Sequence, residues 1–182
     1  MKKQLLVFVF LLSMFSAYSQ RYIWRNGVAT INSSTPLEAF QGVNNSALAV
    51  VDATTGEMEV QIPIKMFRFE KALMQEHFCE NYMETDRYPI ATFRGKITSI
   101  NAIKFNVSGQ YKLNIQGKLT IHGVTKDITT TGTLKIAGGK LSGNTAFEVI
   151  PSDYGIKISP AVVDKIAKKI KITMTLGETN VL

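Results

Sequence analysis

Apolar and polar residues alternate along most of the chain, and this period-two pattern predicts β-strands that are buried on one face and wet on the other. In 58–64, for example, Met58, Val60 and Ile62 share one face, and Glu59 and Gln61 share the other. The same reasoning predicts strands at 23–25, 28–31, 47–51, 58–64, 91–97, 103–107, 111–121, 128–136, 141–149 and 170–176. Asn26-Gly27 lies between the first two and is typical of a tight hairpin turn.

Two segments depart from the strand pattern. Residues 70–83 contain no Gly or Pro and are rich in Ala, Leu, Met, Gln and Glu, which favours a helix. Met74, Phe78 and Tyr82 recur every four residues there, so we expect an apolar stripe that packs on the strands. Residues 160–167 predict a second, short helix that begins with a proline.

Roughly eight antiparallel strands, each wet on one face, must hide a large apolar surface from water. A sandwich and a closed barrel both achieve this, and closure also removes the exposed strand edges that promote aggregation. We therefore predict an all-β domain with one or two short helices. An eight-stranded barrel is either filled by its own side chains or wide enough to hold one small ligand.

Four glycines occupy inward positions of the predicted strands, where a packed core would favour Val or Ile: Gly95, Gly117, Gly132 and Gly143. Glycine within a strand costs about 0.5–1 kcal/mol relative to alanine, so their placement requires a reason. One explanation is strand curvature, because sharply bent barrel strands use glycine. The other is that missing side chains leave a channel, and the sequence favours neither explanation over the other.

The first residues predict export. Lys2 and Lys3 precede an apolar run from 5 to 15, and the small residues Ala17 and Ser19 follow. This order is typical of a signal peptide at 1–19 that is cleaved after Ser19, and the run is short for a membrane span. The remaining 20–182 match one domain of common length, which we expect to be soluble and either periplasmic or secreted.

Charge and cysteine content narrow the function further. The net charge is +7, but the lysines are spread along the chain, and their one cluster at 165–171 has no interleaved aromatic residues for stacking on bases. Nucleic acid is therefore not an expected partner. Cys79 is the single cysteine, so no internal disulfide can form, and its reactivity is left open.

Catalytic and metal-binding patterns are sparse. The chain has two histidines, His77 and His122, too few and too far apart in sequence for a metal site with suitable donors. No strained Gly-x-Ser-x-Gly turn or phosphate-binding glycine loop is present. We predict that the protein is not an enzyme and has no cofactor or metal. An active site at the barrel mouth through His122, Asp127 or Tyr154 would require His122 to face the interior.

Three stretches together resemble the YceI-like family of exported lipid-binding proteins. They are 73–78 continuing through 88–93, then 117–126 with the letters GKLTIHGVTK, then 147–156 ending in Asp153-Tyr154-Gly155-Ile156. The resemblance implies an extended, lipocalin-like barrel of eight strands with a helix beside it. It also implies an interior that holds a long polyisoprenoid chain and no catalytic group.

We therefore predict an exported protein that holds a long apolar lipid, such as a polyisoprenoid, for carriage or storage. The alternative is a side-chain-filled barrel that binds a small amphiphile or a protein partner. Transient membrane contact and a monomer or homodimer are compatible with either function. The residues expected to line the apolar tunnel are Phe93, Leu113, Ile115, Gly117, Leu119, Ile121, Gly143, Phe147, Ile172 and Met174.

Overall fold

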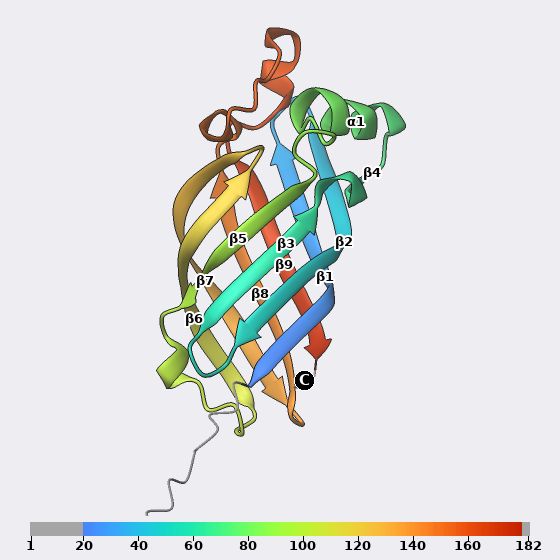
Figure 1. The fold of residues 1–182 in the computed structure, drawn as a ribbon. Coiled ribbons are helices and arrows are strands. Elements are labelled where there is room, and N and C mark those ends of the chain that lie inside the picture. The colour runs from blue at the N-terminus through green and yellow to red at the C-terminus, as the bar shows by residue number, and fades with distance from the viewer. Residues whose placement is uncertain (1–19, 180–182) are drawn as a thin grey trace, which may run out of the picture.

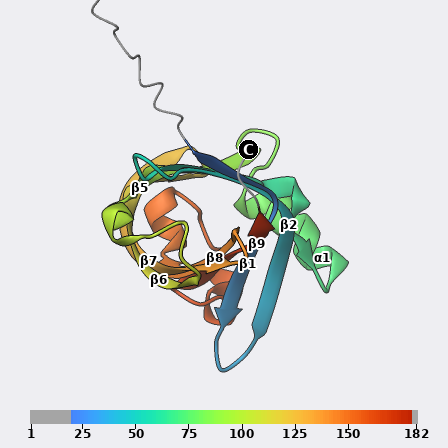
Figure 2. The same ribbon diagram turned by 90° about the horizontal axis from the view of Figure 1, so that it is seen from below.

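Eight antiparallel strands close into a barrel in the computed structural model, which describes residues 20–179 (Figure 1). The strands are β1 (Arg21–Ser34), β2 (Ala39–Asp52), β3 (Glu57–Pro63), β5 (Ile90–Ile97), β6 (Gly109–Ile121), β7 (Val124–Ala137), β8 (Lys140–Val149) and β9 (Ile170–Thr179). Their order is β1-β9-β8-β7-β6-β5-β3-β2, and β2 pairs with β1 to complete the ring seen in Figure 2. The short β4 (Arg68–Phe69) pairs with Gly42 and Val43 near the start of β2. The predicted fold class is confirmed, whereas the predicted signal peptide at 1–19 lies outside the described residues.

The alternation of residue types explains the strands. In β6, Leu113, Ile115 and Leu119 are buried in the interior, whereas Lys112 and Lys118 are exposed on the outer wall. Because side chains of a strand point to opposite faces in turn, a single register buries every apolar residue of β6 at once. The barrel therefore has an apolar interior and a polar outer wall.

The predicted hairpin at Asn26-Gly27 is wrong. Strand β1 continues through these residues, with irregular pairing to β2 on either side of Gly27. A side chain at Gly27 would approach the Ala47 carbonyl oxygen to 3.1 Å, so glycine here permits a close backbone approach and does not form a turn. The β1–β2 turn lies instead at 35–38, where the Thr35 hydroxyl oxygen accepts bonds from the backbone N–H groups of Leu37 and Glu38.

The strand predicted at 103–107 is also wrong. After the 3-10 helix η3 (Ile100–Ala102), the chain runs as a loop across the lower end of the barrel. Ile103 is buried, and the ring of Phe105 stacks on Tyr22 of β1 with centroids 5.8 Å apart. The Tyr111 hydroxyl is within bonding distance of the Lys104 and Val107 carbonyls, which fixes this loop. We call 98–108 the plug, because Ile103 and Phe105 of this loop pack at the lower end of the barrel.

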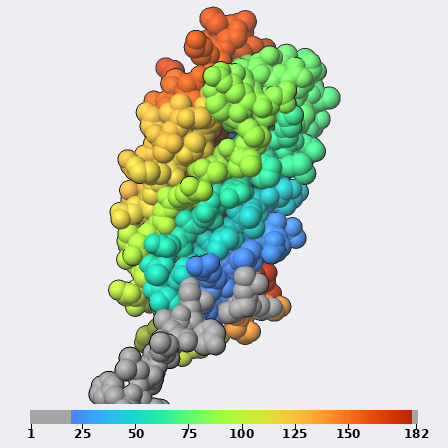
Figure 3. All heavy atoms as spheres, viewed as in Figure 1, coloured from blue at the N-terminus to red at the C-terminus, as the bar shows by residue number. Residues whose placement is uncertain are grey.

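The upper end carries the helical segments. The predicted helix at 70–83 is present as α1 (Ala72–His77) followed by a π-helical turn η2 (Phe78–Tyr82). The 3-10 helix η1 (Ile64–Met66) precedes it, and η4 (Pro151–Tyr154) follows β8. The predicted short helix at 160–167 is the 3-10 helix η5 (Pro160–Lys165), which begins at its proline. In the space-filling view, α1 and the 150–170 segment lie over the same end of the barrel (Figure 3).

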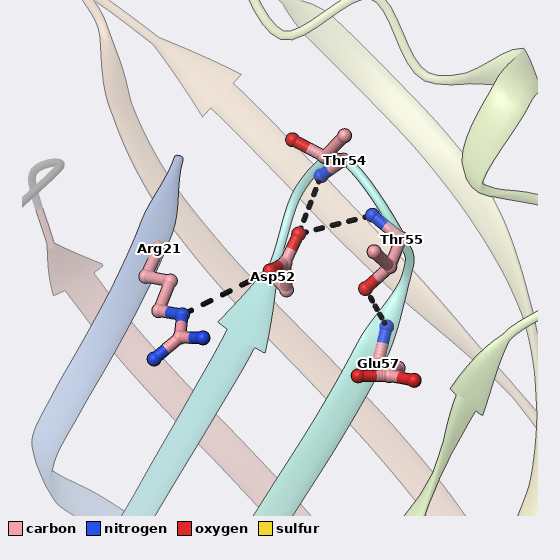
Figure 4. A network of polar contacts seen from close by, with 5 residues as sticks. All are labelled: Arg21, Asp52, Thr54, Thr55 and Glu57. Carbon is pink, nitrogen blue, oxygen red and sulfur yellow. Dashed lines mark hydrogen bonds and ion pairs between the residues drawn. The ribbon is translucent and has the colours of Figure 1, made fainter. Parts of the chain in front are cut away.

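The lower end also holds the β2–β3 turn and both ends of the described chain (Figure 1). One carboxylate oxygen of Asp52 accepts bonds from the backbone N–H groups of Thr54 and Thr55, at 2.8 and 3.0 Å. The other lies 3.8 Å from the guanidinium of Arg21, so β1 is joined to this turn (Figure 4). These contacts connect the β2–β3 turn to the start of β1 at the lower end.

Candidate ligand-binding cavity

Two apolar cavities lie along the barrel axis in the described part of the chain. The upper cavity has a volume of about 490 Å³ and the lower one about 110 Å³. Five residues line both cavities, so the two are neighbours separated by a narrow waist. The waist residues are Ile62, Ala91, Leu119, Phe147 and Ile172. The larger cavity lies within the roughly 300–1,000 Å³ that small-molecule sites usually occupy.

The lower cavity is lined by strand residues and by Phe105 of the plug. Phe93, Leu113 and Met174 come from three different strands and are all buried. Trp24 of β1 also lines it, and the Trp24 indole N–H donates to the Gly177 carbonyl at 2.7 Å. Trp24 is the single tryptophan of the sequence, and this bond pairs its N–H group. The indole ring can therefore line an apolar cavity without leaving a donor unpaired.

The upper cavity has walls of three kinds. The upper halves of the strands contribute Ile31 and Ile121, and α1 with η2 contributes Met74, Phe78 and Tyr82. The Phe78 ring lies 4.9 Å from that of Phe69 and 5.5 Å from that of Phe67, which holds the helical segment against the barrel. A third wall comes from 156–170, whose members here are Ile156, Ile158, Val162, Ile166 and Ile170.

Charged groups among the lining residues lie at the rim of the upper cavity. Lys71, next to α1, forms an ion pair of 3.2 Å with Glu38 of the β1–β2 turn. His77 and Lys165 also line the upper cavity, as do the phenols of Tyr82 and Tyr154. Burial raises the pKa of Tyr154, and the Asp153 carboxylate adds to that effect, so its phenol stays neutral at ordinary pH. A ligand would meet polar groups at the rim and hydrocarbon below it.

Nine of the ten residues expected to line the tunnel do line a cavity. Leu119, Phe147 and Ile172 belong to the waist, and Ile121 belongs to the upper cavity. The lower cavity contains Phe93, Leu113, Ile115, Gly143 and Met174. The sequence-based set therefore describes the lower half and the waist, but it omits almost all of the upper half.

Gly117 is the exception, because it lines neither cavity. It faces Gly95 across the β5–β6 pair, and the ring of Phe93 lies over both. A side chain added at Gly117 would come within 2.7 Å of the Phe93 ring. The space left by this glycine pair is thus filled by an aromatic ring, whereas a side chain at Gly143 would meet only the Thr133 carbonyl oxygen, at 3.4 Å. The channel explanation fits Gly143 and fails for Gly117.

The upper-cavity residues outside the strands were missed as a site. Met74, Phe78 and Tyr82 form a helical stripe in the sequence, and such a stripe indicates packing on the strands without indicating a cavity. In the segment 156–170, Ile158, Val162, Ile166 and Ile170 recur every four residues. Such a pattern does not distinguish a wall of a cavity from a covered loop.

His122 lies outside both cavities and connects three segments. Its side chain is 9% exposed, and its two ring nitrogens lie 3.2 Å from the Tyr154 carbonyl oxygen and 3.0 Å from the Glu84 carboxylate. The Tyr154 carbonyl and the Glu84 carboxylate are both hydrogen-bond acceptors, so His122 is held between two acceptors from different segments. His122 and Glu84 both have a left-handed backbone, with φ of 50° and 43°. We refer to this contact as the latch.

The other candidate groups are dispersed. Asp127 pairs with Lys118 at 3.0 Å on the exposed outer wall, whereas His122 bonds to Tyr154 and Glu84. The Gln75 amide donates to the half-buried sulfur of Cys79 at 3.3 Å. Within 20–179 no three His, Cys, Asp or Glu side chains lie close enough to hold a metal ion. No helix among these residues is sufficiently long and apolar to cross a bilayer.

Known structures share this architecture. A polyisoprenoid-binding domain from Saccharophagus degradans, implicated in plant cell wall breakdown, superposes with a TM-score of 0.75 at 13% identity, covering 89% of this chain and 99% of that one. BcnA of Burkholderia cenocepacia gives 0.67 at 18% identity, covering 82% and 94%. A YceI protein of Campylobacter jejuni gives 0.56 at 21% identity, covering 74% and 80%. At these identities the likeness concerns the fold.

Among curated proteins, none matches the chain significantly. The model of the YceI-like domain, in contrast, matches residues 27–177, which include six of the eight barrel strands in full and most of β1 and β9. The range also contains every residue that lines the two cavities except Trp24. The family assigned from the three sequence stretches is thus confirmed over most of the chain, and the protein belongs to the YceI-like domain family.

Proposed function

We propose that this protein holds a long apolar lipid, of the polyisoprenoid class, inside its barrel for carriage or storage. The observation that supports this most is the pair of neighbouring apolar cavities, which share the five waist residues, with charged groups at the rim of the upper one. The Saccharophagus domain, named for polyisoprenoid binding, has the same fold, which is consistent with the proposal. Residues 1–19 support export to a periplasmic or external location.

The energetics favour binding from water but not from membranes. Each methylene removed from water contributes about 0.8 kcal/mol, so a chain of many carbons prefers the barrel strongly over solution. A bilayer solvates the same chain equally well, and binding also costs the ordering of the lipid. We therefore propose loose retention and ready exchange with membranes, which suits a carrier rather than an enzyme.

Native mass spectrometry of protein purified without detergent tests the proposal. We expect an added mass equal to that of one lipid, which extraction and lipid analysis then identify. The waist residue Ala91 is 6% exposed and lines both cavities, so Ala91→Phe would place a ring between them. This variant should lose long lipids, while Ala137→Phe on the exposed end of β7 should retain them.

Two results would count against the proposal. A ligand-free protein that takes up no lipid from vesicles would contradict it. A short amphiphile that binds equally to the wild type and to Ala91→Phe would show that only the upper cavity is used, as in the alternative of a binding module for small amphiphiles. Export is checked separately by intact mass: cleavage after Ser19 gives a mature chain whose first residue is Gln20, and its mass is correspondingly lower.

A further inference from the structure

The segment 156–171, which we call the cap, is amphipathic although it contains little regular structure. Its isoleucines and Val162 line the upper cavity, as described above. Its lysines are exposed to solvent, and Lys165 among them also reaches the rim of the cavity: Lys157, Lys165, Lys168, Lys169 and Lys171. The cap lies across the open end of the barrel in Figures 1 and 3. One side of this segment therefore covers the ligand site, while the other presents positive charge to the surroundings.

The positive charge of the cap is largely uncompensated. Asp164 is the only acidic residue of 156–171. Lys169 pairs with Glu148 at 3.3 Å, but within residues 20–179 no ion-pair partner lies near Lys157, Lys165 or Lys168. Unpaired lysines at the rim of a cavity favour an anionic surface at that place.

Three exposed apolar side chains belong to the same rim of the upper cavity. Leu37 of the β1–β2 turn is 69% exposed, Leu73 of α1 is 63% exposed and Val163 of the cap is 47% exposed. Their chain neighbours Glu38 and Val162, and Leu73 itself, line the upper cavity, so all three belong to its rim. Single exposed leucines are ordinary on protein surfaces. Apolar residues grouped with lysines around an opening are instead typical of surfaces that insert shallowly into anionic membranes.

We propose that this rim, made of the cap together with Leu37 and Leu73, docks on bilayers that contain anionic lipids. In that position the mouth faces the membrane, and a lipid moves between bilayer and barrel without crossing water. This transfer rests on the proposed function, whereas docking itself is measurable without any bound lipid. The phosphate-bearing surface of the bilayer is the partner that the lysines recognise, and its hydrocarbon receives Leu37, Leu73 and Val163.

Cosedimentation with sucrose-loaded vesicles tests docking. We expect strong binding to phosphatidylcholine vesicles that contain phosphatidylglycerol, weak binding to phosphatidylcholine alone, and release by added salt. The double variant Lys165→Glu, Lys168→Glu should lower the partition coefficient on anionic vesicles at least about tenfold. Lys112→Glu with Lys135→Glu is the matched control, because both lysines are exposed near the closed end on β6 and β7 and the charge change is the same. Val163→Ser should weaken binding while leaving the charge unchanged.

The results separate docking from lipid binding. Equal binding to neutral and anionic vesicles, or an equal loss in the control variant, would overturn the docking proposal. No binding of the wild type to either vesicle would overturn it as well, and capture of a protein in place of lipid would assign the rim to a different partner. Native mass spectrometry of the same samples reports the bound lipid independently, so a lipid-loaded protein that ignores vesicles leaves the proposed function standing.

Discussion

The ring of Phe93 on β5 lies directly over Gly117 of β6, where a Cβ atom would come within 2.7 Å of it. Gly95, the cross-strand partner of Gly117, lies under the same ring. The pair of glycines therefore makes room for one aromatic side chain in the wall of the lower cavity.

Gly117→Ala should destabilise the barrel by about 2 kcal/mol, because the added methyl group forces the Phe93 ring and the β5 backbone to shift. Urea unfolding followed by circular dichroism measures the change. Gly177→Ala is the control, since a side chain at Gly177 meets no atom within 4 Å and should leave stability unchanged or raise it. Equal stability of Gly117→Ala and wild type would contradict the close approach of the β5 backbone and the Phe93 ring to Gly117.

The single tryptophan provides a probe of ligand depth. Trp24 lines the lower cavity beyond the waist, so a lipid with bromine near its apolar end should quench Trp24 fluorescence only when the chain passes the waist. We expect quenching by a long brominated chain and little by a short one held in the upper cavity. Ala91→Phe should abolish the quenching by the long chain while leaving the emission of the free protein similar.

Loss of the plug should open the lower end. Phe105→Ala removes the stacking on Tyr22 and should cost about 2 kcal/mol, less than the 3–5 kcal/mol typical of a fully buried phenylalanine, because Phe105 is half-buried. Acrylamide should then reach Trp24 more readily, which fluorescence quenching measures. Val107→Ala in the same loop removes a side chain that is 46% exposed and should change neither property. A plug variant with unchanged quenching would contradict closure by Phe105.

The latch should stabilise the upper end through its hydrogen bonds. Glu84→Ala removes the acceptor for His122 and should cost about 1 kcal/mol, with faster hydrogen exchange in 84–88. Glu84→Gln keeps an acceptor oxygen at the same place and should be milder. Because Glu84 also lies 3.9 Å from Arg87, Arg87→Ala controls for that weaker, exposed pair. If Glu84→Gln proved as harmful as Glu84→Ala, charge rather than hydrogen bonding would hold the latch.

Strands were predictable where alternation and burial agree, as in β6, because a single register satisfies all of its residues. Two local signals failed for physical reasons. Asn26-Gly27 favours a turn in isolation. In the barrel, the missing side chain of Gly27 instead allows β1 to pass close to Ala47 of β2. Ile103, Phe105 and Val107 alternate with polar residues, as in a strand. In the folded protein, however, Phe105 packs on Tyr22 at the end of the barrel, and this contact holds the segment as a loop.

The site was predictable to the same extent. Leu113, Leu119 and Met174 follow from the inward face of their strands, since any inward residue of a hollow barrel lines the hollow. Gly117 does not follow, because the position of the Phe93 ring depends on a rotamer that the sequence does not state. The cap and the helical stripe could not be assigned either, since the four-residue spacing around Ile158 and Met74 does not distinguish residues that face a cavity from residues that pack on the barrel.

Both ends of the described chain lie at the plugged end of the barrel, where Thr179 of β9 bonds to the Ile23 carbonyl of β1. A tag, a fusion partner or a solid support attached after β9 would hold the molecule by its base. The rim would then point outward into solution, and immobilised protein on a sensor surface would offer its opening to passing vesicles in a uniform orientation.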